Sequence, residues 1–255
     1  MIETLLCADE PAAFRTEREH GRSAYFIICD HAGSLIPRRL GHLGLGDADL
    51  VRHIAWDIGA AEVACRLGEL LDACVVLQTY SRLVIDCNRP IGSPGSIVAL
   101  SEATRIPGNE NIGAQDARRR EHEVFRPYHD RIRSLLDARI GRGAATQLVS
   151  MHSFTPIFMG TGRPWQAGML YNRDPRLARV LLSILRRDVS LQVGENEPYS
   201  VSDSSDYAIP EHGEKRAIPH VEIEIRQDLI DTPAGQQEWA ERLARALSEA
   251  QIPPR

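Results

Sequence analysis

The sequence of 255 residues has few aromatic residues, no excess of positive charge and no long apolar segment. Phe, Trp and Tyr together make up 5% of it, so its core must consist mainly of aliphatic side chains. The net charge is −5, with basic and acidic residues interleaved, which gives no reason to expect nucleic-acid binding. No segment approaches the roughly 18–20 consecutive apolar residues that a membrane-spanning helix needs. We therefore expect neither a nucleic-acid nor a membrane partner.

Cysteine is also scarce, and the five residues include no C-x-x-C pair. They are Cys7, Cys29, Cys65, Cys74 and Cys87. Four of them lie within apolar runs, so we interpret the cysteines as reduced and mostly buried. The N-terminal segment MIETLLCADEPAAF has early acidic residues and lacks the basic and long apolar regions of a signal peptide. These features predict a cytoplasmic protein.

Apolar runs alternate with segments of helical periodicity along the chain. Strands are predicted at residues 24–31, 73–80, 146–153, 166–172 and 218–226, with a shorter extended piece at 82–90. Helices are predicted at residues 47–71, 114–140, 175–188 and 233–250, and Pro127 is expected to kink or split the second. Residues 91–113 show no periodicity and predict a long functional loop. This alternation favours one α/β domain over residues 1–255, with a largely parallel or mixed sheet covered on both faces.

Two histidines follow predicted buried strands. His31 comes shortly after the apolar run that ends at Cys29, and His152 lies at the end of TQLVSM. The carboxyl ends of strands in an open α/β sheet are where ligands bind, and imidazole is a common zinc ligand. The pattern is typical of a metal site held by a sheet, or of two hydrogen-bonded structural histidines.

Other histidines have polar or helical surroundings. The four that we expect at the solvated surface are His20, His42, His122 and His129. His53 lies four residues before Asp57, so the two share one face of the predicted helix. An exposed polar pair is one interpretation. The apolar neighbours of Asp57 favour the other, in which its carboxylate points inward.

Charged residues alternate with aliphatic ones in the last predicted strand. Glu222, Glu224 and Arg226 therefore project from one face of that strand. They predict a polar cavity or a charge-paired patch, although an edge strand facing water would show the same alternation.

An arginine-rich piece follows the second predicted strand. Asn88 and Arg89, with Arg82 before them, end an otherwise apolar segment. A guanidinium fork is a natural partner for a substrate carboxylate. A local ion pair between Asp86 and one of the arginines is the alternative.

Six segments resemble the N-formylglutamate amidohydrolase family. They are DHAGSLIP (30–37), HIAWDIGA (53–60), YSRLVIDCNRP (80–90), IPGN (106–109), SMHSFTP (150–156) and VEIEIRQDL (221–229). Together they extend over most of the chain, and their order and spacing make the match specific as a set.

The resemblance implies a three-layer α/β/α sandwich with a mixed, mostly parallel central sheet, like that of the zinc carboxypeptidase-like hydrolases. That group binds zinc through a His-x-x-Glu motif and a second, much later histidine, with a spacing that His31 and His152 match. Ser34 stands in the position of the glutamate, so the resemblance assigns the third metal ligand to Asp57.

The resemblance also implies roles for the remaining polar residues. Asn88 and Arg89, helped by Arg82, would bind the carboxylate of the substrate, and Glu224, or else Glu222, would act as general base. The expected cofactor is zinc. The expected partner is a small N-formyl or other N-acyl amino acid such as glutamate, and the sequence does not indicate an oligomeric state.

Three other functions stay open at this point. The amidohydrolase could act on another N-acyl amino acid or on a small peptide-like amide. The serine at position 34 is also compatible with a member that binds a small molecule without catalysis. A metal-free hydrolase would use Ser34 or Ser153 as nucleophile, but no G-x-S-x-G elbow occurs in the sequence.

Overall fold

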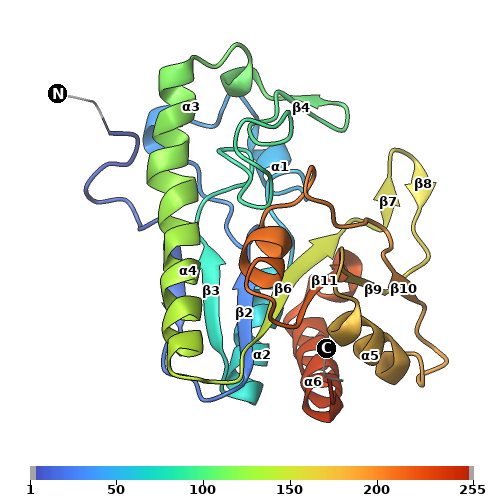
Figure 1. Ribbon diagram of the computed structural model, residues 1–255. Coiled ribbons are helices and arrows are strands. Elements are labelled where there is room, and N and C mark those ends of the chain that lie inside the picture. The colour runs from blue at the N-terminus through green and yellow to red at the C-terminus, as the bar shows by residue number, and fades with distance from the viewer. Residues whose placement is uncertain (1–3, 253–255) are drawn as a thin grey trace.

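The computed structural model describes residues 4–252 and shows a central sheet between two layers of helices (Figure 1). This arrangement confirms the predicted three-layer α/β/α sandwich. The division into domains, predicted as one unit over residues 1–255, stays a prediction, and its first and last three residues lie outside the described part. None of the helices in residues 4–252 combines the length and the apolar character needed to cross a membrane.

The central sheet has seven strands in the order β1-β3-β2-β6-β11-β9-β10. Their bounds are β1 (Phe14–Glu17), β2 (Tyr25–Cys29), β3 (Cys74–Gln78), β6 (Gln147–Phe154), β9 (Ala167–Leu170), β10 (Val193–Glu195) and β11 (His220–Arg226). The pairs β3–β2, β2–β6, β6–β11 and β9–β10 are parallel. The pairs β1–β3 and β11–β9 are antiparallel, so the sheet is mixed and mostly parallel, as predicted.

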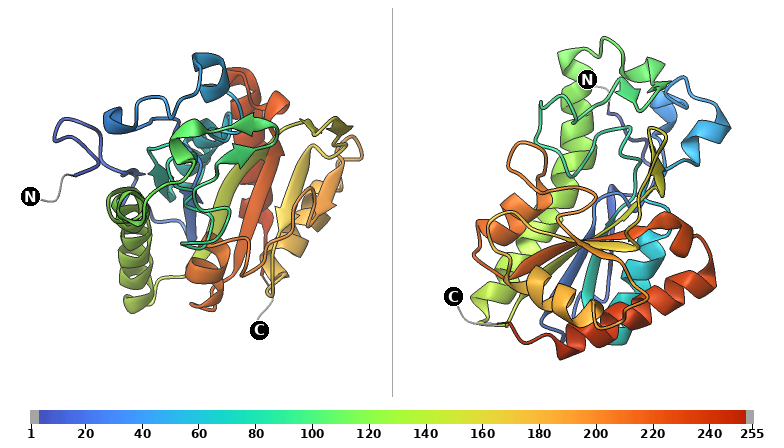
Figure 2. Two further views of the ribbon diagram at one scale, coloured as in Figure 1. Left: turned by 90° about the horizontal axis from the view of Figure 1, so that it is seen from above. Right: turned by 90° about the vertical axis from the view of Figure 1, so that its right-hand side faces the viewer.

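Helices cover both faces of this sheet (Figure 2). The layer on one face consists of α2 (Ala60–Leu71), α5 (Arg176–Leu185) and α6 (Pro233–Glu249). The layer on the other consists mainly of α4 (Arg126–Gly141), and α3 (Ala114–Arg120) precedes it in the chain. Strand β2 shows how one strand serves both cores: Ile27 packs with the first layer, whereas Phe26 and Ile28 pack with the second.

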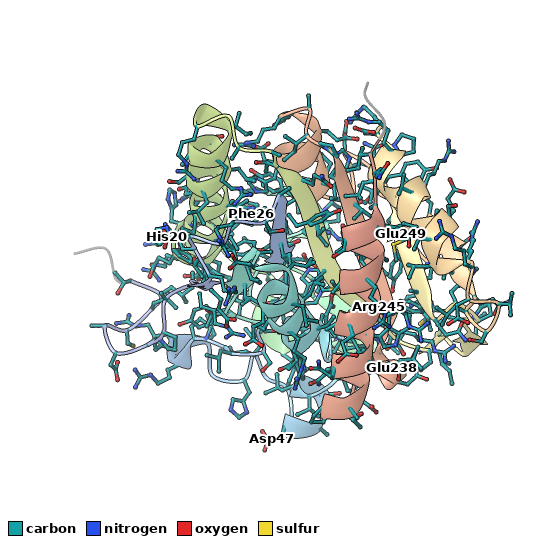
Figure 3. All side chains as sticks on the ribbon, turned by 90° about the horizontal axis from the view of Figure 1, so that it is seen from below. His20, Phe26, Asp47, Glu238, Arg245 and Glu249 are labelled. Carbon is teal, nitrogen blue, oxygen red and sulfur yellow. The ribbon has the colours of Figure 1, made fainter. Side chains whose placement is uncertain are left out.

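Helix α6 illustrates how sequence pattern produces this packing. It begins after Thr232, whose Oγ1 accepts a hydrogen bond from the Gly235 N–H (3.3 Å) and so caps the helix. Trp239 and other apolar residues of α6 are buried against the sheet layer. Glu238 and Arg245 lie along its outer side (Figure 3), so the helix separates apolar and charged faces.

The remaining elements are short and connect the main ones. Two hairpins are formed by β4 (Leu100–Ser101) with β5 (Thr104–Arg105) and by β7 (Ile157–Phe158) with β8 (Thr161–Gly162). The other helical pieces are α1 (Asp47–Leu50), 3-10 turns at Arg38–Leu40, Pro107–Asn109 and Gln227–Leu229, and π-helical turns at Glu121–Phe125 and Ile209–Glu214. The first π-helical turn lies within the helix predicted at 114–140, just before Pro127, but α3, this turn and α4 follow one another without a break, so the helix is not split there.

Two predicted elements are wrong. The helix predicted at 47–71 exists only as α1 and α2, and residues 51–59 between them form turns. Gly59 explains the late start of α2, because its φ of +77° is left-handed and an added Cβ would lie 2.1 Å from the Ile230 carbonyl oxygen. The extended piece predicted at 82–90 instead forms turns, with hydrogen bonds such as Arg89 N–H to Asp86 O (3.2 Å).

Candidate metal centre

The predicted site residues meet at the carboxyl ends of the central parallel strands. His31 follows β2, His152 lies near the end of β6, and Glu224 lies near the end of β11. Asp57 reaches the same place from the turns between α1 and α2, where its backbone N–H donates to His31 O (3.0 Å). Arg82 comes from the turns that follow β3. Segments far apart in the sequence thus build one buried polar site, at the edge of an α/β sheet where ligands bind.

Three side chains direct ligand atoms to one point. His152 Nδ1 lies 2.8 Å from Asp57 Oδ2 and 3.2 Å from His31 Nδ1, and His31 Nδ1 lies 3.3 Å from Asp57 Oδ2. All three residues are buried. They form a candidate metal site among the described residues. Ser34, at the position of the family glutamate, is exposed.

The donor set fits a zinc ion. Four-coordinate zinc with bonds of about 2.0–2.1 Å places its ligand atoms roughly 3.3 Å apart, close to the spacing of these three atoms. The other nitrogen of each imidazole faces a carboxylate, which favours the tautomer that carries its proton on Nε2 and presents Nδ1 as a ligand. A cation held by the three ligand atoms would balance the negative charge of Asp57 and of the nearby carboxylates.

Two aspartates that sequence reasoning missed hold the histidines. His31 Nε2–H donates to Asp86 Oδ1 (2.7 Å), and His152 Nε2–H points to Asp30 Oδ2 (3.3 Å). Ser150 Oγ also lies 3.1 Å from His152 Nε2. Such carboxylate–histidine pairs fix the tautomer and the ring orientation of metal-binding histidines. The signal in the sequence was present, since Asp30 immediately precedes His31.

Charges in the site shift the pKa values of its acids and bases. Burial opposes ionisation of Asp57, but the neighbouring His31 and His152 lower the pKa of Asp57 below its usual value. Burial likewise opposes ionisation of Asp86, whose pKa is lowered mainly by Arg82 and His31. Burial disfavours the charged form of His152, but Glu222 and hydrogen bonds to two aspartates raise its pKa well above the usual value. The site therefore favours a concentration of positive charge at the histidines.

Arg82 is used within the protein. Its Nε and Nη2 donate to Asp86 Oδ2 (3.2 and 2.8 Å), and its Nη1 donates to Asp57 Oδ1 (3.3 Å). The local ion pair with Asp86 that was the alternative to substrate binding is therefore present. Arg82 links the candidate ligand Asp57 to the aspartate that orients His31.

Glu222 and Glu224 point into the site from β11. This strand lies between β6 and β9, which excludes the alternative of an edge strand facing water. Burial raises the pKa of Glu222 to about 7 and raises that of Glu224 well above its usual value, since the nearby His152 only partly offsets the burial. Glu224 lies opposite His152 in the strand register, and its buried Oε2 has no hydrogen-bond partner among residues 4–252. Glu222 lies two residues earlier on β11, opposite Ser150 of β6.

Asn88 and Arg89 also contact the protein itself. Asn88 Nδ2 donates to Glu222 Oε2 (3.2 Å), and its Oδ1 accepts from the Tyr207 and Ala208 N–H groups (3.1 and 3.0 Å). Arg89 Nη1 donates to Asp206 Oδ1 (3.3 Å) and to a backbone carbonyl. The structure brings both residues beside the predicted base. Both ends of the Asn88 amide are occupied, whereas the hydrogen bonds of Arg89 use only its Nη1.

His129 is buried, and its predicted surface position is wrong. Its Nε2–H donates to Cys87 O (2.8 Å), so its Nδ1 must accept from His212 Nε2–H (2.9 Å). Burial lowers the pKa of His129 to about 4, so it is neutral at pH 7. The helical face explains the error: His129 lies four residues after Phe125 and three before Ile132, on the apolar side of the helix.

The other predicted surface histidines are exposed, namely His20, His42 and His122. His53 is half-buried and lies 3.1 Å from Glu102 Oε1, away from the Asp57 that shares its predicted helix face. Ser153 Oγ donates to Ile58 O (2.9 Å), so its proton is not directed to a histidine. The geometry therefore does not favour a serine nucleophile.

Fold and site together define a three-layer α/β/α protein with a buried candidate metal centre. The model of the N-formylglutamate amidohydrolase family matches residues 23–231. The chain belongs to this family, which confirms the resemblance and supports amidohydrolase activity.

Solved structures with the same fold agree with this assignment. A gene product of Agrobacterium tumefaciens is 35% identical, with a TM-score of 0.92, over 96% of this chain and 98% of that one. The N-formylglutamate amidohydrolase of Ralstonia eutropha is 17% identical, with a TM-score of 0.69, over 92% of this chain and 96% of that one. At that identity the similarity shows the fold alone. No protein with a curated description matches the chain.

Proposed function

We propose that this protein is a zinc-dependent amidohydrolase that removes a formyl or another acyl group from the amino group of an amino acid such as glutamate. The observation that carries the proposal is the convergence of His31, Asp57 and His152 on one point beside the unpartnered Oε2 of Glu224. Family membership supports the hydrolysis of an amide. The donor set of two imidazoles and one carboxylate supports zinc.

Zinc held by these three side chains would act as a Lewis acid that activates a water molecule and polarises the amide carbonyl. Asp86 and Asp30 would keep the two imidazoles in the tautomer that presents Nδ1. Arg82 would hold the Asp57 carboxylate in place through its Oδ1 while Oδ2 faces the histidines.

Glu224 is the proposed general base. Its Oε2 would accept a proton from the attacking water, and the same carboxyl group would then donate that proton to the leaving amine nitrogen. Burial raises the pKa of Glu224, which makes its carboxylate a stronger base than an exposed one. Glu222 is less suited to this role, because Asn88 already donates to its Oε2.

Metal content provides the first test. Purified wild type is expected to contain about one zinc per chain by elemental analysis, and His31→Ala and His152→Ala are expected to lose it, because each removes one of three protein ligands. His53→Ala is the matched control, since His53 also lies near a carboxylate but outside the candidate site. Wild type without stoichiometric metal, or full metal content in both ligand variants, would contradict the proposed site.

Variants of the two glutamates test the general base. Glu224→Gln is expected to lower kcat for N-formylglutamate by about 10²–10⁴-fold with unchanged metal content. Glu222→Gln, which replaces the neighbouring buried carboxyl group in the same way, should cost less. The reverse order of the two losses would assign the proton transfer to Glu222. A panel of N-formyl and N-acetyl amino acids identifies the preferred acyl group and side chain.

We also propose a cytoplasmic location. All five cysteines are free thiols, and three of them are buried. Thiols of this kind persist in a reducing compartment. Thiol alkylation of the protein in fresh cell extract, followed by mass spectrometry, should label the half-buried Cys7 and Cys65 without prior reduction.

A further inference from the structure

Arg163 lies in an aromatic cage beside the candidate site. Its guanidinium carbon lies 4.6 Å from the ring centroid of Phe158, 4.7 Å from that of Tyr199 and 5.8 Å from that of Phe154. Arg163 Nη1 donates to Tyr199 Oη (2.8 Å) and, at longer range, to Thr155 O (3.5 Å). Stacking on aromatic rings covers the faces of the planar group and leaves its edge to interact with a partner.

The edge of this guanidinium has no carboxylate partner within residues 4–252. The hydrogen bonds described for Arg163 use only Nη1, which leaves Nε and Nη2 for a ligand. The two arginines predicted to bind the substrate each have a carboxylate partner within the protein. Arg82 contacts Asp57 and Asp86, and Arg89 contacts Asp206. A guanidinium fork without an acid is the natural receptor for a carboxylate, because two parallel N–H groups match its two oxygens.

The cage faces the same site as Glu224. Arg163 follows the β7–β8 hairpin, which continues directly from β6 and its His152 (Figure 1). The Tyr199 ring arrives from the loop after β10, where Gly168 on β9 permits the close approach of the Glu197 backbone. Burial and the Glu224 carboxylate raise the pKa of Tyr199, whereas Arg163 and Arg82 oppose this rise. The Tyr199 hydroxyl therefore lies within electrostatic range of both the proposed base and Arg82.

We infer that Arg163, held by Phe158 and Tyr199, binds a carboxylate of the N-acyl amino acid substrate. This inference rests on the proposed amidohydrolase function and adds a residue that binds the substrate. The carboxylate belongs either to the α-carbon or to the side chain of the amino acid. Both present the same planar anion to Nε and Nη2 of Arg163.

Three substrates show in one experiment whether Arg163 binds the α-carboxylate or the side-chain carboxylate. N-formylglutamate carries both carboxylates, N-formylglutamine lacks the side-chain carboxylate, and the α-carboxamide of N-formylglutamate lacks the α-carboxylate. For Arg163→Gln, kcat/KM is expected to fall about 10–100-fold on every substrate that carries the bound carboxylate, since a charge-assisted hydrogen bond is lost. On the analogue without that carboxylate the loss should be below about threefold. Arg163→Lys, which keeps the charge but not the fork, should fall between wild type and Arg163→Gln.

Arg179→Gln is the matched control. Arg179 also stacks on a tyrosine, Tyr171 (5.6 Å), and donates to its hydroxyl (3.1 Å), but it is paired with Glu195 and lies on α5 outside the site. This variant should leave kcat/KM unchanged on all three substrates. Zinc content and melting temperature are measured for each variant to show that the fold and the metal centre are intact.

The outcomes distinguish this inference from the proposed function. A loss in Arg163→Gln that depends on one of the two carboxylates supports the inference and identifies the group. Equal losses on all three substrates, or no loss on any, would overturn it while wild-type turnover still supports the amidohydrolase. A wild type that hydrolyses none of the three contradicts the proposed function, and the inference fails with it.

Discussion

Replacement of Asn88 by alanine is expected to destabilise the fold rather than to weaken substrate binding alone. The side chain is 2% exposed, and both ends of its amide are occupied. Nδ2 donates to Glu222 Oε2 (3.2 Å) and Asp206 Oδ1 (3.5 Å), and Oδ1 accepts from the N–H groups of Tyr207 and Ala208. Two donors and two acceptor sites are thus used, which leaves no polar group of this side chain for a substrate.

The magnitude follows from the groups that alanine would leave behind. Two backbone N–H groups would lose their acceptor in a buried region, at a cost of about 1–3 kcal/mol each. The hydrogen bond to Glu222 would be lost as well, and these contributions are not additive because they share one side chain. We expect the free energy of unfolding to fall by about 3–5 kcal/mol, a large part of a typical domain stability of about 5–15 kcal/mol. For a chain of this length the melting temperature should then fall by roughly 10 °C.

Guanidinium unfolding followed by circular dichroism measures this loss, with KM for N-formylglutamate determined on the same preparations. Asn172→Ala is the matched control, because Asn172 Nδ2 also donates to two carboxylates, Asp203 (3.2 Å) and Glu214 (3.2 Å), but is only half-buried. The control should lose less than about 1 kcal/mol. A similarly small loss for Asn88→Ala, together with a raised KM, would refute the reasoning and restore Asn88 as a substrate ligand.

Two further predictions concern residues around the site. Burial lowers the pKa of His129 from 6.5 to about 4, so the unfolded chain binds the extra proton between these values and stability falls as the pH falls through this range. The fall in the free energy of unfolding amounts to up to about 3 kcal/mol. In His129→Gln the free energy of unfolding, measured between pH 6.5 and 4, should decrease less steeply than in wild type. An equal slope in the two proteins would exclude His129 as the cause of the pH dependence. In Gly168→Ala the new Cβ would lie 1.9 Å from Glu197 O, so the loop that carries Tyr199 must shift. A stability loss of about 1–3 kcal/mol and a lower kcat/KM are expected, and an unchanged melting temperature would contradict this.

The strands that were predictable from the sequence are those with continuous apolar runs. Buried strands such as β2 and β3 must be apolar on both sides because helices cover both faces of the sheet. Edge strands lack that constraint, so β1, with the sequence FRTE, and β10, with VGE, were not predicted. The helix predicted at 47–71 failed for another reason: its apolar spacing is helical, but tertiary contacts at Gly59 hold residues 51–59 in turns.

The site residues that could be predicted from the sequence are those that stand at the end of an apolar run. His31 follows β2 and His152 lies near the end of β6, and the structure places their Nδ1 atoms 3.2 Å apart. Asp57 required the family resemblance, because its turn could not be distinguished from a helix by spacing. Asp86 was considered only as the partner of an arginine, whereas its second oxygen orients His31. Local pattern identifies a residue that ends a strand but not the contacts between distant turns.

The charge balance of the site connects these observations. Five carboxyl groups are buried at or around the candidate metal centre, from Asp30, Asp57, Asp86, Glu222 and Glu224. Arg82 is the guanidinium that contacts two of these acids, and it cannot compensate all of them. Burial raises the pKa values of Glu222 and Glu224, whereas those of Asp30, Asp57 and Asp86 are lowered, so the negative charge lies mainly on the three aspartates. This charge favours a cation between the histidines. Because Arg82 and Arg89 are needed to neutralise the protein's own acids, recognition of an anionic substrate requires a guanidinium outside this network. Arg163 fits that requirement, since its cage supplies aromatic rings and a hydroxyl but no acid.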